Sequence, residues 1–181
     1  MAEEKSKKRI KHTKELILAF DGGSRNNPGP SGSGWVIYEA IVRDDVIHNN
    51  LVAFGYKYLG PKETNNVAEW TALLLGLRFL AETDLEYDTL KVTGDSKLVI
   101  MQMAGLWKCK ALNLIPLKIE CKTLINRMKK KHEFVHQKRD LNEMADLMSN
   151  VAMDTQGERI TRVFEEEKEA SLSTLKEMLL H

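Results

Sequence analysis

Two short apolar segments that each lead into an aspartate place the strongest constraint on how this chain can fold. Residues 16–20, Leu-Ile-Leu-Ala-Phe, run directly into Asp21, and residues 90–94 run into Asp95. Short apolar runs that end in turn-forming residues are typical of buried β-strands. If the two strands are neighbours, both carboxylates leave the sheet at the same edge. Such a pair is repulsive and partly desolvated, and it is tolerated when a cation lies between the groups or when one stays protonated.

The patterns between these two segments predict a hairpin and a helix. Residues 22–34 are rich in Gly, Pro and Ser and are expected to form a loop. β-Branched and aromatic residues over 35–41 and 51–58 flank a polar turn at 44–45, as in an antiparallel hairpin. Apolar positions three and four apart over 66–81 predict an amphipathic helix.

The second half of the chain alternates helices with a last strand. We expect a helix that Ser96 caps, a longer helix over 112–130, a strand at 134–135, and a helix that Asp140 caps and that runs through Ala152. The order along the chain is βββαβααβα. The fold class is therefore α/β, with a five-stranded mixed sheet flanked by helices.

The length and charge pattern predict one catalytic domain with two tails. The chain has 181 residues and 43% hydrophobic content, enough for one ordinary core. We assign residues 1–14 to a basic, disordered N-terminal arm, 15–155 to the catalytic domain and 156–181 to a C-terminal helical extension. The arm is compatible with a nuclear address, a nucleic-acid-binding extension or a spacer. An amphipathic extension more often docks on its own domain than on a partner.

Charge and cysteine usage narrow the compartment and the class of partner. The net charge of +1 gives no general reason to expect a polyanionic partner, so that case rests on basic clusters in the arm and over 127–139. Cys109 and Cys121 lack the density of a disulfide framework and the spacing of a zinc site. No apolar run is long enough to span a bilayer, and the first residues are charged. These features predict an intracellular protein, cytoplasmic or nuclear, with no membrane contact.

Four acidic residues in four separate elements form the candidate metal site: Asp21, Glu69, Asp95 and Asp146. Small residues beside the two helical members allow close packing on the strands. Oxygen ligands favour hard cations such as Mg²⁺ or Mn²⁺ over zinc, and two such ions about 4 Å apart hydrolyse phosphodiesters. Taken singly, each acid also fits a turn, a helix cap or a solvent-facing charge.

Four motifs in order resemble those of type 1 ribonucleases H. Asp21-Gly-Gly-Ser-Arg-Asn-Asn-Pro-Gly-Pro30 is similar to the opening motif of that family, and Thr64-Asn-Asn-Val-Ala-Glu69 to the start of its first helix. Gly94-Asp-Ser96 and Arg139-x-x-Asn-x-x-Ala-Asp146 resemble its third and fourth motifs. The likeness covers about residues 14–155. The spacing of the four acids and the motifs around them thus favour a shared metal site over a separate turn, cap or surface role for each acid.

This resemblance implies an endonuclease that cuts the RNA strand of RNA:DNA hybrids with two Mg²⁺ or Mn²⁺ ions, leaving 5′-phosphate and 3′-hydroxyl ends. The four carboxylates are the implied catalytic and metal ligands. The candidate substrate contacts are Gly22, Asn27, Asn65, Asn66, Ser96, Arg139, Asn142, Lys108 and Lys110. Short amides on loops suit sugar hydroxyls and groove edges, which distinguish the RNA strand.

Two departures from the best-known family pattern matter for the mechanism. The basic helix-and-loop protrusion that many members carry is absent, because residues 107–113 lead straight into a helix. Lys108 and Lys110 are candidate substitutes, since phosphate contacts need only cationic reach. His136 lies ten residues before Asp146, as does the turnover histidine of many members, but it lacks the preceding glycine. Its catalytic role competes with a structural one and with Lys138 and Arg139 as cations near the scissile phosphate.

Two rival functions remain open at this point. One is the ribonuclease H domain of a reverse transcriptase; the short arm and self-contained motif set favour a free-standing monomer with no obligatory protein partner. The other is a non-catalytic nucleic-acid-binding module of the same fold, against which the retention of all four carboxylates argues.

Overall fold

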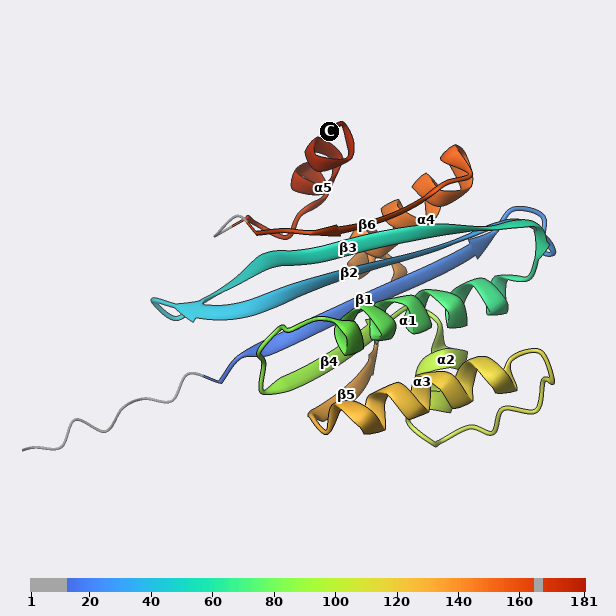
Figure 1. Ribbon diagram of the computed structural model, residues 1–181, viewed down its shortest axis with the longest axis horizontal. Coiled ribbons are helices and arrows are strands. Elements are labelled where there is room, and N and C mark those ends of the chain that lie inside the picture. Colours follow the sequence, from blue (N-terminus) through green and yellow to red (C-terminus); the bar gives the residue numbers. More distant parts are fainter. Residues whose placement is uncertain (1–12, 165–167) are drawn as a thin grey trace, which may run out of the picture.

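The computed structural model describes residues 13–164 and 168–181, and these form a six-stranded mixed sheet with helices on both faces (Figure 1). The sheet order is β5-β4-β1-β2-β3-β6. The strands are β1 (Glu15–Ser24), β2 (Gly29–Arg43), β3 (Val46–Glu63), β4 (Thr89–Gly94), β5 (Lys131–His136) and β6 (Glu158–Arg162). The helices are α1 (Asn65–Glu82), α2 (Lys97–Met103), α3 (Ile115–Met128), α4 (Glu143–Thr155) and α5 (Leu172–Leu179), with a short 3₁₀ turn at Arg139–Leu141.

The predicted α/β class is confirmed, whereas the predicted count of five strands is wrong. β1, β2 and β3 form the expected antiparallel meander, and β4 and β5 add to β1 in parallel. The sixth strand, β6, pairs antiparallel with β3 in the region predicted to be helical. Its apolar residue Ile160 is 68% exposed, so β6 is held by backbone pairing on a long neighbour and shows no buried alternation.

Two hydrophobic cores lie on opposite faces of the sheet. The larger core packs α1, α2 and α3 on one face, around Trp35, Trp70 and Leu77. The smaller core packs α4 and α5 on the other face, around Phe54 and Met148. Figure 1 shows the two groups of helices on either side of the sheet. None of the helices built from the described residues is long and apolar enough to cross a membrane.

The glycine-rich stretch 22–34 is not the predicted loop. β1 continues to Ser24 and β2 begins at Gly29, so a four-residue turn joins them. The glycines serve packing: a Cβ on Gly22 would lie 2.1 Å from the backbone carbon of Ala68, and one on Gly34 would lie 2.4 Å from the Ser149 nitrogen. The strands therefore approach α1 and α4 at backbone distance, which brings the helices close to the sheet edge.

Of the two predicted helix caps, the cap of α2 is confirmed and the cap of α4 is wrong. Ser96 caps α2 as expected, accepting a hydrogen bond from the Val99 backbone nitrogen at 3.3 Å. Asp140 does not cap α4, because it lies in the 3₁₀ turn and the helix begins at Glu143. The side chain of Asn142, at the N-cap position, is instead turned inward and donates to the Phe20 carbonyl at 2.9 Å.

The predicted N-terminal arm lies almost entirely outside the described residues.

The C-terminal segment, in contrast, continues the sheet edge before it forms a helix. After β6, the Leu51 backbone nitrogen donates to the Lys168 carbonyl at 2.7 Å, so the segment also pairs with β3. Helix α5 then places Leu175, which is fully buried, against the smaller core.

Replacing Leu175 by alanine is expected to lower the free energy of unfolding by about 2–4 kcal/mol, because it empties a closed apolar site. Urea denaturation of the full chain measures the change. Leu180, directly after the same helix and 84% exposed, is the matched control, and Leu180→Ala should leave stability within about 0.5 kcal/mol. Equal effects of the two substitutions would contradict the packing of α5.

Candidate active site

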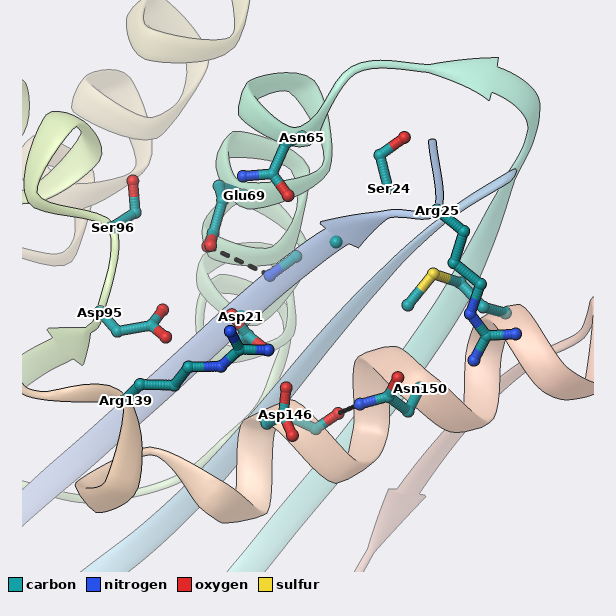
Figure 2. A pocket seen from close by; sticks show the side chains of 13 residues that line it. Asp21, Ser24, Arg25, Asn65, Glu69, Asp95, Ser96, Arg139, Asp146 and Asn150 are labelled. Carbon is teal, nitrogen blue, oxygen red and sulfur yellow. Dashed lines mark hydrogen bonds between the residues drawn. The ribbon is translucent and has the colours of Figure 1, made fainter. Parts of the chain in front are cut away.

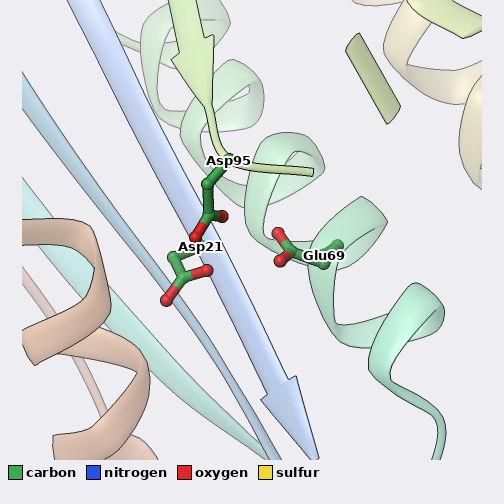
Figure 3. A group of neighbouring side chains, drawn as sticks. All are labelled: Asp21, Glu69 and Asp95. Carbon is green, nitrogen blue, oxygen red and sulfur yellow. The ribbon is translucent and has the colours of Figure 1, made fainter. Parts of the chain in front are cut away.

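The first two carboxylates lie close together, as the sequence predicts, although only Asp95 follows the end of its strand. β1 and β4 are parallel neighbours, with Phe20 opposite Gly94 in the register. The next residues therefore lie side by side: Asp21 within β1, which continues to Ser24, and Asp95 directly after the end of β4. Figure 3 shows both side chains pointing toward the same space, beside α1.

Glu69 joins this pair from α1. The Gly22 backbone N–H donates to Glu69 Oε2 at 3.1 Å, which fixes the carboxylate against β1. The contact is possible because Gly22 has no side chain and packs directly on the backbone of Ala68 and Glu69. Asp21, Glu69 and Asp95 each offer one oxygen such that all three lie within 4.8 Å of one another.

Asp146 approaches the same space from α4 but is not part of this closest group. Two contacts hold α4 in place: the Asn142 amide donates to the Phe20 carbonyl, and the Ser149 hydroxyl donates to Asp21 Oδ2 at 3.2 Å. Helix α4 is thereby tied to β1 at Phe20 and Asp21, directly beside the carboxylates.

Burial and mutual repulsion raise the pKa of two of these carboxylates. The pKa of Asp21 rises from 3.8 to about 8, chiefly through burial and then through the charges of Asp95 and Asp146. The pKa of Glu69 also lies well above its usual value, because the side chain is buried and faces Asp21 and Asp95. The protein alone therefore does not neutralise this group of acids.

The residues present fit a hard divalent cation. Asp95 belongs to the close group of three carboxylates, and its Oδ1 is buried and has no hydrogen-bond partner among the described residues. A buried acceptor of this kind is costly unless a ligand satisfies it. All donors are carboxylate oxygens, the type that divalent Mg²⁺ and Mn²⁺ prefer.

The carboxylates line a pocket of about 500 Å³ (Figure 2). It contains eight residues that the sequence singled out: Asp21, Gly22, Asn65, Glu69, Asp95, Ser96, Arg139 and Asp146. It also contains five that sequence reasoning missed: Gly23, Ser24, Arg25, Asn150 and Met153. The last two follow Asp146 at four and seven residues, so helical periodicity from that carboxylate was a usable signal.

The other predicted contacts lie outside the pocket lining. Asn27 is exposed and its side chain accepts from the Asn65 backbone nitrogen at 2.9 Å, which ties the β1–β2 turn to α1. Asn66, Lys108 and Lys110 are solvent-accessible but do not line the pocket.

Two predicted residues make backbone contacts that orient the site. Asn142 is 2% exposed and donates to Phe20, so a direct substrate contact does not fit its position. His136 ends β5, as its sequence context suggested, and its Nε2 hydrogen-bonds the Asp95 carbonyl at 3.1 Å. This contact uses the backbone of Asp95 and leaves its carboxylate free.

Comparisons with known proteins agree with this geometry. The family model described as reverse transcriptase-like matches residues 19–152. The chain is 36% identical over 141 residues to a bifunctional protein of Mycobacterium tuberculosis, covering 77% of this chain and 36% of that protein. The chain thus spans about a third of the length of this relative.

Two solved structures are similar over most of their length. The crystal structure of ribonuclease H1 from Halobacterium salinarum is 34% identical with a TM-score of 0.66, and the match covers 78% of this chain and 98% of that one. A ribonuclease H1 named LC11, isolated from compost and solved in complex with an RNA/DNA hybrid, is 32% identical with a TM-score of 0.65, again over 78% and 98%. With the four motifs and the carboxylate geometry, these matches show that the chain belongs to the type 1 ribonuclease H family.

Proposed function

We propose that this chain is an endonuclease that hydrolyses the RNA strand of RNA:DNA hybrids and leaves 5′-phosphate and 3′-hydroxyl ends. The observation that carries the proposal is the convergence of Asp21, Glu69 and Asp95 within 4.8 Å, beside Asp146, in one open pocket. The family relative that was solved with an RNA/DNA hybrid supports the choice of substrate. The enzyme acts as a monomer and needs no protein partner.

Two Mg²⁺ ions, replaceable by Mn²⁺, are the proposed cofactors, held by Asp21, Glu69, Asp95 and Asp146. Bound ions of this kind activate a water and stabilise the leaving oxygen of the phosphodiester. The chain itself aims the ligands: the Gly22 N–H holds one oxygen of Glu69, and the Ser149 hydroxyl holds one oxygen of Asp21. All four carboxylate residues line the pocket.

Polar groups around the carboxylates are proposed to orient the hybrid. Asn65 lines the pocket at the start of α1, where its amide suits the sugar hydroxyls and base edges of the minor groove. Arg139 lines the pocket whereas His136 bonds the Asp95 backbone, which favours Arg139 as the cation near the scissile phosphate. Exposed Lys108 and Lys110 follow α2 and are proposed to contact phosphates away from the cut.

Incubation with end-labelled RNA:DNA, RNA:RNA and DNA:DNA duplexes, each with Mg²⁺ and with EDTA, tests this function. We expect cleavage of the RNA in the hybrid alone, and only with Mg²⁺. Products that ligate to a 3′-hydroxyl acceptor through their 5′-phosphate confirm the predicted ends. Binding of the hybrid without any cleavage in Mg²⁺ or Mn²⁺ would support the non-catalytic alternative instead.

A further inference from the structure

We propose that Arg25 is a phosphate-binding residue that Asp154 holds in reserve until nucleic acid binds. In the free protein Arg25 Nη2 lies 2.6 Å from Asp154 Oδ1 on α4. When the hybrid enters, the guanidinium exchanges this carboxylate for a phosphate oxygen of the nucleic-acid backbone. The inference rests on the proposed function and adds a binding site beyond the scissile phosphate.

The charge of the pocket calls for such a residue. Its lining holds four carboxylates and two arginines, Arg25 and Arg139. Divalent ions offset part of this negative charge at the cut, but the neighbouring phosphates of a polyanion still need cationic contacts. Figure 2 shows the two arginines on opposite sides of Asp146, along α4. The hybrid backbone that crosses the carboxylates therefore meets a cation on each side.

The position of Arg25 is fixed by its backbone and not by its ion pair. Its backbone nitrogen donates to the Pro30 carbonyl at 2.8 Å across the β1–β2 turn. Gly29 packs so closely that a Cβ there would lie 1.8 Å from the Arg25 carbonyl oxygen. The turn is also tied to α1 by the Asn27–Asn65 hydrogen bond. The backbone of Arg25 is therefore held in place independently of the ion pair, and the side chain can exchange its carboxylate partner from a fixed origin.

The ion pair with Asp154 is weak enough to exchange. The two side chains are 48% and 62% exposed, and exposed pairs of this kind contribute about 0–1 kcal/mol. An arginine can instead hold a phosphate through two parallel hydrogen bonds, a geometry that gives a stronger contact. Asp154 lies eight residues after Asp146, or about 12 Å along the helix, so the phosphate bound by Arg25 is not the scissile one.

Binding of a labelled RNA:DNA hybrid, followed by fluorescence anisotropy over a series of NaCl concentrations, tests the proposal. The full chain carrying Asp95→Asn serves as the parent, so that the hybrid is not cut during the measurement. Adding Arg25→Ala should raise the Kd about tenfold, the size of one charged hydrogen-bonded contact. It should also reduce the slope of log Kd against log salt by about 0.9, the value for one phosphate. Arg25→Lys should restore most of the slope.

Asp154→Asn separates phosphate binding from a merely structural ion pair. If Asp154 only competes with the phosphate, its loss leaves the Kd unchanged or lowers it by up to about fivefold. Arg78→Ala is the matched control, because Arg78 pairs with Glu120 at similar exposure on α1 and α3, away from the pocket; it should change neither the Kd nor the slope.

Two results would overturn the inference. Equal weakening by Arg25→Ala and Asp154→Asn with an unchanged salt slope would mean that the pair only stabilises the turn. If the parent does not bind the hybrid and the wild-type chain does not cut it, the proposed function fails and this inference fails with it. If the wild-type chain cuts the hybrid but Arg25→Ala binds like its parent, the role of Arg25 alone is refuted.

Discussion

Asp95→Asn is expected to reduce Mg²⁺-dependent cleavage of the hybrid by at least about a thousandfold, equal to ~4 kcal/mol of transition-state stabilisation. Asp95 Oδ1 is the buried carboxylate oxygen without a protein partner in the described part of the chain, so the change to an amide removes the charge of a proposed metal ligand. Fold and hybrid binding should persist, because His136 holds Asp95 through its backbone carbonyl. Single-turnover cleavage and hybrid anisotropy measure the two effects.

Asp45→Asn provides the matched control for that substitution. Asp45 is an exposed aspartate in the turn between β2 and β3, away from the pocket, and its change to asparagine should leave the cleavage rate unaltered. Unchanged cleavage by Asp95→Asn, or an equal loss in both variants, would rule out the proposed ligand role.

Asp21→Asn is expected to stabilise the metal-free protein by up to about 5 kcal/mol at pH 8 and to abolish cleavage. The pKa of Asp21 rises from 3.8 to about 8 through burial and the neighbouring carboxylates. Below pH 4 the carboxyl is protonated in both the folded and the unfolded states. Between pH 4 and pH 8 the folded state retains a proton that the unfolded chain releases, so stability falls as the pH rises.

Urea denaturation in EDTA at several pH values measures this effect. The gain in the free energy of unfolding from Asp21→Asn should grow between pH 4 and pH 8 and then level off. Saturating Mg²⁺ should reverse the order, because an ion that binds the folded wild-type site stabilises it by mass action. A gain that is the same at every pH would show that the asparagine acts through packing and not through charge.

The site was more predictable from the sequence than the edges of the fold. Asp21 and Asp95 each end an apolar run, and parallel pairing of those runs was enough to bring the two carboxylates together. Glu69 and Asp146 were identified by their motifs, and α1 and α4 pack against the sheet as expected of helices with small residues beside the acid. Local sequence patterns were sufficient to predict an element where burial determines which residue types occur in it.

The errors arose where long-range pairing or close approach overrides local composition. β6 carries a single apolar residue, Ile160, and forms because the 18-residue strand β3 offers a free edge. The glycines over 22–34 suggested a loop, but they lie in β1 and β2, where the lack of a side chain allows α1 and α4 to pack closely on the strands. Asn142 was predicted as a substrate contact because a sequence motif gives the residue type but not the direction of its side chain. The side chain is turned toward Phe20.

The contact of Gly22 with the backbone of Ala68 has a consequence for the choice of ion. Main-chain atoms of the two segments therefore set the gap between β1 and α1 at this point. Discrimination between cations of different radius depends on how far the ligands yield, and Ca²⁺ needs longer bonds and more oxygens than Mg²⁺. A gap set by main-chain atoms should therefore favour the smaller ion at the proposed site. Changing the ion preference of the proposed site would thus require a different packing of β1 against α1.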